Sequence, residues 1–187
     1  MKAVMISIRP EWCAMIANGR KTIEVRKTKP KLETPFKCYI YCTKPKRRFT
    51  HGGLVDYTDE LYRLPNGEIR FGYSGELMLY PGEYSKDNFL CGKVIGEFVC
   101  DKILDIFISS SDPNMKPLPF PCTGLTDKQI MDYLGNGVTG YGWHISELKI
   151  YDKPKELREF CRMEKTKEWA FPQRITKPPQ SWCYVEG

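Results

Sequence analysis

The sequence predicts an α+β domain built around a small mixed β-barrel of five to six strands, with two or three short helices. Short segments whose apolar residues alternate with a period of two recur along the chain, and short helical segments lie between some of them. No βαβ unit repeats, which disfavours a parallel sheet. A chain of 187 residues, 41% of them hydrophobic, suits a single domain over residues 1–187 with its own core.

The first 42 residues predict three strands and one short helix. Residues 4–8 alternate in the way expected of a strand with one buried face. Pro10 ends that strand and suits the first turn of a helix, which Gly19 closes. Residues 20–26 alternate again, with three polar side chains on one face, and residues 36–42 have the aromatic and β-branched content of a third strand.

An excursion at about residues 44–90 interrupts this pattern. Residues 61–64 and 68–71 flank Pro65-Asn66-Gly67, and an Asn-Gly pair between alternating segments is a strong hairpin signal. We expect a surface hairpin there.

The second half of the chain predicts the remaining elements. These are a long central strand at 93–105 that bends near Gly96, a helix at 126–135, a strand at 143–151, a helical turn at 155–161 and a last strand at 181–185. Thr126 and Gly135 are the capping residues expected at the two ends of that helix.

Composition excludes several classes of protein. A mean hydropathy of −0.46 and the absence of an apolar run of about 18 residues argue against a membrane span. The first residues are too few and too polar for a signal peptide, so we expect a soluble, cytoplasmic protein.

The eight cysteines are expected to be reduced thiols that pack as small apolar residues, since no export signal is present. The nearest pair, Cys38 and Cys42, would lie about 13 Å apart on an extended strand, too far to share a metal ion. There is no Cys-x-x-Cys, and His51 and His144 are the only histidines. We predict no metal and no cofactor.

Charge is concentrated in the first quarter of the chain. Residues 1–50 carry a net charge of +10 and residues 51–187 one of −4. A basic block beside an acidic remainder indicates a face that attracts an anion such as nucleic acid, although a solvated, solubilising face fits the composition equally well.

Three segments resemble the ASCH domain, a branch of the PUA-like β-barrel superfamily. The opening similarity lies in Ile8-Arg9-Pro10, in Ile16-Ala17-Asn18-Gly19-Arg20-Lys21-Thr22-Ile23-Glu24-Val25-Arg26, and in residues 39–43. Gly96, residues 143–151 and residues 178–185 are similar to the closing part of longer bacterial and phage members. The resemblance implies a barrel with a cleft and a ligand that is a nucleic acid or a modified base. In one small subgroup it implies hydrolysis of N4-acetylcytidine.

Four charged residues form the candidate binding site. Arg9 ends the first strand, Lys21 opens the second, and Glu24 and Arg26 lie on the second, with connections short enough to bring all four to one rim. A guanidinium binds phosphate through two bonds, and a carboxylate accepts from an exocyclic amine. The alternative is an exposed ladder of ion pairs worth about 0–1 kcal/mol each. A shared pocket requires Lys21 to precede the regular strand or to lie at a bulge, because alternation otherwise sets it opposite Glu24.

The enzyme alternative is an amidohydrolase that acts on a small acylated nucleoside. Lys21 and Glu24 would be its acid and base, and Thr22 or an activated water its nucleophile. In the acetylcytidine hydrolases that the chain resembles, a Thr follows the Lys by three residues, whereas here Glu24 does. Thr22 faces away from Lys21 in a regular strand, so we expect little turnover.

Further binding candidates lie outside this group. Lys44, Lys46, Arg47 and Arg48 are expected to contact phosphate, or to form a solvated loop, and Trp182 to stack on a base or to pack in the core. The first hypothesis is therefore a domain that binds RNA or a modified nucleobase in a basic cleft. The second is the amidohydrolase, and the third is a protein-interaction module whose 44–90 excursion binds a partner.

Overall fold

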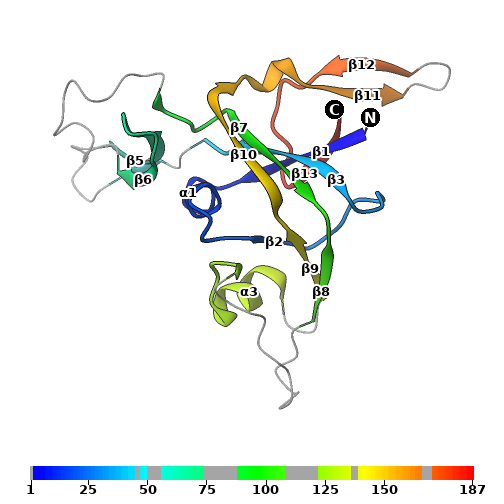
Figure 1. Ribbon diagram of the computed structural model, residues 1–187, viewed down its shortest axis with the longest axis horizontal. Helices are drawn as coiled ribbons and strands as arrows, with labels where there is room; N and C mark the ends of the chain where they lie inside the picture. Colours follow the sequence, from blue (N-terminus) through cyan, green and yellow to red (C-terminus); the bar gives the residue numbers. More distant parts are fainter. Residues whose placement is uncertain are drawn as a thin grey trace, which may run out of the picture.

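The computed structural model describes residues 2–44, 47–49, 56–73, 88–107, 122–135, 139–165 and 170–187, with the backbone alone at 47–49, 56–59, 73, 107 and 165. These residues form thirteen strands, two α-helices and one 3-10 helix, arranged as in Figure 1. The mixed α+β class is confirmed, and the described strands outnumber the five to six barrel strands and the one hairpin that the sequence predicted.

A five-stranded sheet forms the centre of the molecule. Its order is β10-β7-β3-β1-β13, in which the strands are Ser146–Lys155, Val94–Cys100, Phe36–Cys42, Lys2–Ile8 and Trp182–Glu186. β1 is parallel to β3 and antiparallel to β13, so that Ile6 lies between Ile40 and Trp182. The strands predicted at 4–8, 36–42 and 181–185 are confirmed.

Both faces of β1 are buried, although the sequence pattern predicted one. Val4, Ile6 and Ile8 belong to the larger core cluster, and Ala3 and Met5 to a second cluster on the other side. The second face is covered by Leu157, Phe160, Ile175 and other residues from the last third of the chain. Because this cover comes from a distant segment, the alternation within β1 could not reveal it.

A second sheet of three strands positions the candidate site. Its order is β2-β9-β8, with bounds Ile23–Arg26, Thr139–His144 and Ile103–Phe107. The single strand predicted at 93–105 is wrong, since β7 and β8 belong to different sheets, and the strand predicted at 143–151 is likewise divided between β9 and β10.

The chain passes between the two sheets at one corner twice, from β7 to β8 and from β9 to β10. These two passages explain why each predicted strand is divided. Asp101 and Lys102 are exposed there, and the Lys102 carbonyl accepts from the backbone N–H of His144 at 2.9 Å. The N–H of Ile145 donates to the Thr22 carbonyl at 2.8 Å. Near Gly96 the β3–β7 register shifts, but the change of sheet comes later.

The sheets do not close into a barrel in the described parts of the chain, so this part of the prediction is corrected. β2 forms no backbone ladder with β1. Instead the side chain of Arg26 reaches from β2 to the carbonyl of Ser7 on β1, at 2.6 Å. The Arg26 side chain thus spans the opening between β1 and β2, where a closed barrel would have backbone hydrogen bonds between strands.

Two helices flank this opening. α1 (Pro10–Ala17) ends before Gly19, whose φ of +68° lets the chain turn so that the N–H groups of Arg20 and Lys21 both reach the Met15 carbonyl. α3 (Asp127–Leu134) has the capping box of Thr126 and Gln129. Both predicted helices are confirmed, and the predicted helical turn is the 3-10 helix η3 (Leu157–Glu159). No helix in the described ranges is long and apolar enough to cross a membrane.

Hairpins complete the described structure. β5 (Asp56–Arg63) and β6 (Ile69–Tyr73) form the predicted hairpin, and β4 (Arg47–Phe49) pairs with β5. The hairpin is not purely a surface feature, because Leu61 and Ile69 are buried in the larger core cluster. A second hairpin of β11 (Cys161–Lys165) and β12 (Ala170–Arg174) was not predicted, since exposed β12 lacks an apolar alternation.

Candidate functional site

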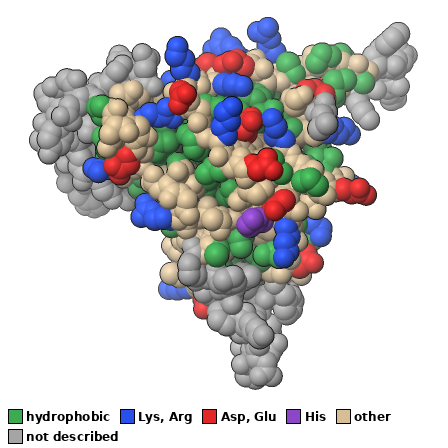
Figure 2. Space-filling view, viewed as in Figure 1, with side chains coloured by type: hydrophobic (Ala, Val, Ile, Leu, Met, Phe, Trp, Pro, Cys, Tyr) green, Lys and Arg blue, Asp and Glu red, His purple; other side chains and the backbone are tan. Residues whose placement is uncertain are grey.

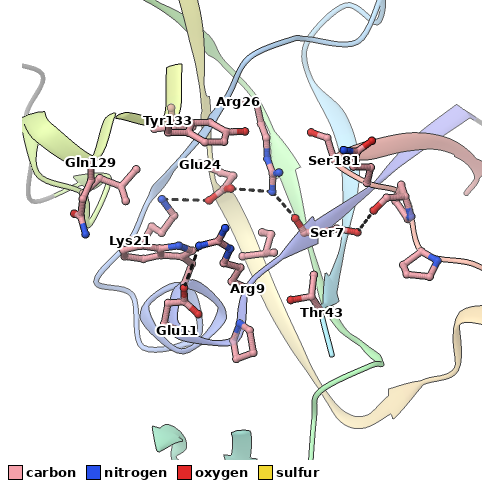
Figure 3. A pocket seen from close by; sticks show the side chains of 18 of the residues that line it. Ser7, Arg9, Glu11, Lys21, Glu24, Arg26, Thr43, Gln129, Tyr133 and Ser181 are labelled. Atoms are coloured by element: carbon pink, nitrogen blue, oxygen red, sulfur yellow. Dashed lines mark hydrogen bonds and ion pairs between the residues drawn. The ribbon is translucent and has the colours of Figure 1, made fainter. Parts of the chain in front are cut away.

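A cavity of about 820 Å³ opens where the two sheets and the two helices meet (Figure 3). Segments from five places in the chain line it. They are residues 7–12 at the end of β1 and the start of α1, Lys21 with Glu24–Arg26, Thr43–Lys44 after β3, Leu125 with three residues of α3 (Gln129, Asp132, Tyr133), and residues 178–181. The cavity therefore depends on contacts between distant parts of the sequence.

A buried group of three charged side chains forms the inner wall. Lys21, Glu24 and Arg26 have side chains that are 2%, 8% and 9% exposed. Glu24 Oε2 lies 3.2 Å from Lys21 Nζ, and Glu24 Oε1 lies 2.9 Å from Arg26 Nη2. The structure therefore brings three of the predicted site residues together in one concavity, as Figure 3 shows. The alternative, a ladder of exposed ion pairs, is wrong for these three residues because their side chains are buried.

Lys21 reaches Glu24 because it precedes the regular strand. β2 begins at Ile23, so the alternation that would set Lys21 opposite Glu24 does not apply, and this geometric requirement is confirmed. Lys21 Nζ also donates to the carbonyls of Ile23 at 2.9 Å and Thr123 at 2.6 Å. With two N–H groups bound to carbonyls, at most one remains for Glu24 or for a ligand.

Two atoms of the buried group have no hydrogen-bond partner among the described residues. Glu24 Oε2 forms an ion pair with Lys21 Nζ, but the geometry is not that of a hydrogen bond. Arg26 Nε has no acceptor among the described residues. One is a buried acceptor and the other a buried donor. Unsatisfied buried polar atoms cost about 1–3 kcal/mol each.

Ser7 connects the opposite wall to the same group. Its carbonyl accepts from Arg26, its N–H donates to the Ser181 carbonyl at 2.9 Å, and its hydroxyl donates to the Pro179 carbonyl at 2.6 Å. The segment 178–181 is thus fixed to β1 by two hydrogen bonds. Ser7 was not among the predicted site residues, and its signal was a polar side chain on the face of β1 that otherwise carries Ala3 and Met5.

Two predicted cations lie at the cavity rim. The Arg9 side chain is 65% exposed and its Nη1 lies 4.0 Å from Glu11 Oε1, and Lys44 is exposed on the segment after β3. Lys46 falls outside the described residues, and for Arg47 and Arg48 only their backbone places in β4 are described. Their expected contact with phosphate stays a prediction.

Two other predicted residues do not line the cavity. The Trp182 indole packs 6.0 Å from the Trp143 ring, between centroids, and donates to Thr28 Oγ1 at 3.0 Å. Thr22 is fixed by its backbone bonds to Cys122 and Ile145 at the sheet corner. The aromatic residues that do line the cavity are Trp12 and Tyr133.

The two helices each contribute side chains to the cavity wall, α1 through Trp12 and α3 through Gln129 and Tyr133. Lys21 Nζ lies 5.6 Å from the centre of the Trp12 ring, and Tyr133 is 38% exposed. Gln129 Oε1 accepts from the Thr126 N–H, which leaves the amide nitrogen for other partners. The predicted helix gave no sign that Gln129 and Tyr133 face this cavity, because that depends on how α3 packs through Ile130 and Leu134.

No cysteine is among the described residues that line the cavity. Burial raises the pKa of the Cys13 thiol, and a hydrogen bond to Cys13 followed by burial raises the pKa of Cys42 well above its ordinary value. Such thiols are poor nucleophiles. The predicted packing of cysteines as small buried residues is confirmed for Cys13, Cys38, Cys42 and Cys100, whereas Cys91, Cys122, Cys161 and Cys183 are partly exposed. The described residues contain no group of three or more His, Cys, Asp or Glu placed to hold a metal ion.

Comparison with known proteins identifies the fold. No protein-family model matches the sequence, and no curated protein matches it. The crystal structure of a point mutant of the ASCH protein from Zymomonas mobilis covers 100% of this chain and 91% of that one, at a TM-score of 0.50 and 15% identity. The match to the crystal structure of ASCH from the same organism covers 98% of this chain and 87% of that one, at a TM-score of 0.48 and 16% identity. The chain has the fold of the Zymomonas mobilis ASCH protein over its full length, and the ASCH resemblance is confirmed at the level of the fold.

Proposed function

We propose that the cavity binds a nucleobase, either within RNA or as a modified nucleoside, and that Glu24 and Arg26 recognise its polar edge. The observation that carries this proposal is the Glu24–Arg26 pair in the cavity wall, in which one polar atom of each side chain, the acceptor Glu24 Oε2 and the donor Arg26 Nε, has no hydrogen-bond partner among the described residues. An ion pair of 2.9 Å between Glu24 Oε1 and Arg26 Nη2 holds the two side chains side by side. A ligand edge that both donates and accepts would suit this pair.

Nucleobases present edges of this kind. Cytosine and adenine each place an exocyclic amine beside an acceptor nitrogen, and a carboxylate accepts from such an amine. A cavity of about 820 Å³ is within the usual range for small-ligand sites, roughly 300–1,000 Å³. Trp12 and Tyr133 supply aromatic surface against which a base gains about 1–3 kcal/mol by stacking.

The amidohydrolase alternative has less support from the same geometry. Two N–H groups of Lys21 are bound to carbonyls, so Lys21 supports Glu24 rather than a nucleophile. The Thr22 hydroxyl is not part of the cavity lining. Nucleobase binding therefore remains the preferred function.

Substitution of Glu24 tests the proposal. Glu24→Gln preserves the shape but replaces one acceptor oxygen with a donor, so binding of cytidine and adenosine should weaken by about tenfold, the equivalent of one hydrogen bond of roughly 1.4 kcal/mol. Uridine, whose corresponding edge carries a carbonyl, should gain relative to them. Titration calorimetry of both proteins with the three nucleosides measures the change.

The matched control is Glu159→Gln, an exposed glutamate on η3 that lies outside the cavity. It should leave all three affinities unchanged. The same nucleoside preferences in wild type and Glu24→Gln would contradict recognition by Glu24.

A further inference from the structure

The buried group carries one more positive than negative charge. Lys21 and Arg26 surround the single carboxylate of Glu24, and all three side chains are at least nine-tenths buried. A net charge in a region of low dielectric favours an anion nearby. The other two carboxylates of the lining, Glu11 and Asp132, are less buried, and Glu11 already lies beside Arg9.

The rim above this group has two further cations on one side. β1 and β3 are parallel, and Ile8 pairs with Cys42 at their carboxyl ends. The N–H of Thr43 donates to the Ile8 carbonyl at 2.8 Å, which holds the two strand ends together. Arg9 and Lys44 are the residues that follow, so both cations lie at the same edge of the sheet.

Both rim cations have capacity for a ligand. Arg9 Nη1 is 4.0 Å from its nearest carboxylate, Glu11, the outer limit of an ion pair. Lys44 forms no ion pair within the described part of the chain, and its side chain passes over Gly92 with Cγ 3.3 Å from the position a Cβ would take there. A guanidinium and an ammonium at one edge suit a phosphate, which accepts from both.

We propose that the ligand is a nucleotide rather than a nucleoside, with its phosphate against Arg9 and Lys44 at the rim while its base lies against Glu24 and Arg26. This inference rests on the proposed function and adds the phosphate as part of the recognised unit.

The test compares nucleosides with their phosphates. Cytidine, adenosine, their 5′- and 3′-monophosphates and inorganic phosphate are titrated into the wild-type protein at low salt. One of the two monophosphates should bind at least about tenfold more tightly than its nucleoside, because charge-assisted hydrogen bonds to phosphate are among the strong ones. Inorganic phosphate alone should bind much more weakly than that nucleotide.

Variants locate the phosphate. In Arg9→Gln and in Lys44→Gln the ratio of monophosphate to nucleoside affinity should fall toward one. Arg158→Gln, an exposed arginine on η3 outside the cavity, serves as control and should keep the wild-type ratio. An equal fall in all three variants would overturn the proposed position, because it would indicate a general effect of net charge.

The outcomes separate this inference from the proposed function. If nucleosides bind through Glu24 but neither phosphate improves affinity, the phosphate subsite is overturned and nucleobase binding stands. If inorganic phosphate binds as well as the nucleotides, the site is a simple anion site and the nucleotide is overturned. If neither nucleosides nor nucleotides bind, both proposals fail.

Discussion

At the scale of single residues, Lys21 and Lys37 make the same kind of ion pair in different surroundings. Lys21 Nζ lies 3.2 Å from Glu24, and Lys37 Nζ lies 3.3 Å from Glu97. The Lys21 side chain is 2% exposed and that of Lys37 is 44% exposed. The two ion pairs have similar lengths, so burial of the lysine is what distinguishes the structural pair of Lys21 from the surface pair of Lys37.

Replacing each lysine by methionine should show this difference. Lys21→Met leaves the Glu24 carboxylate buried beside one cation and removes the donor to two carbonyls, so the free energy of unfolding should fall by about 3–5 kcal/mol. Lys37→Met should cost only about 0–1 kcal/mol. Urea unfolding of both variants gives the two values, and similar losses would contradict the structural role of Lys21.

The residues of the site differ in how far the sequence could predict them. Lys21, Glu24 and Arg26 lie within six positions of one another, so local spacing and the ASCH resemblance were enough. Tyr133 belongs to the same cavity but is over a hundred residues away, and only the packing of α3 brings it there. Trp182 shows the converse, because its local sequence suited a ligand while tertiary packing placed it beside Trp143.

At the scale of elements, a carboxylate and a phenol connect β7 to β10. The Tyr151 hydroxyl donates to Glu97 Oε2 at 2.5 Å, and Lys37 Nζ donates to Glu97 Oε1 at 3.3 Å. Partial burial acts to raise the pKa of Glu97, but the bonds from Tyr151 and Lys37 outweigh it, and the pKa is lowered. Burial, followed by the bond to Glu97, raises the pKa of Tyr151.

These two shifts predict the pH range over which the pair stabilises the fold. The lowered pKa of Glu97 means that its contribution is present above the unfolded value of about 4.3 and is lost as pH falls through the folded pKa. The raised pKa of Tyr151 means that its contribution is present below about pH 10 and is lost as pH rises through the folded pKa.

Thermal unfolding between pH 3 and 11 tests this range. Tyr151→Phe should lower the melting temperature at neutral pH and flatten the alkaline decline. Ser146→Ala is a matched control, since its hydroxyl bonds to the Val99 carbonyl at 2.8 Å across the same strand pair but does not titrate in this range. An alkaline decline in Tyr151→Phe as steep as in the wild type would contradict the assignment.

The elements themselves were largely predictable, and the exceptions have one cause. Periodicity and caps predicted β1, α1, β3, α3 and the β5–β6 hairpin, all of which depend on local sequence. The divisions between β7 and β8 and between β9 and β10 were not predictable, because both sides of each break have strand-like sequence. The chain changes sheets there because the corner bonds at Lys102 and Ile145 join segments distant in sequence.

At the scale of the whole molecule, basic and acidic side chains are interspersed on the face shown in Figure 2. The excess of positive charge in the first fifty residues does not form one continuous patch among the described side chains of that face. The cations of interest are instead those at the cavity rim and those expected at 44–48.

Salt dependence tests whether the 44–48 cations contact a nucleic-acid backbone. If they do, affinity for a short single-stranded RNA should fall with salt, each neutralised phosphate adding about 0.7 to the log–log slope. Replacing Arg47 and Arg48 with Ala should reduce that slope without changing base preference. Replacing exposed Lys153 and Arg158 removes the same charge elsewhere and should leave the slope unchanged, and a flat wild-type response would contradict binding to a polymer.

The bond between Ser7 and residues 178–181 has a consequence for the newly made protein. A ribosome that adds roughly 5–20 residues per second makes Arg26 about 8–30 s before it reaches residue 178. Until then β1 has no β13 beside it, and the wall that Ser7 holds is missing. A nascent chain therefore presents Lys21, Glu24 and Arg26 in an incomplete site, and the complete site can form only after residues 178–181 have been made.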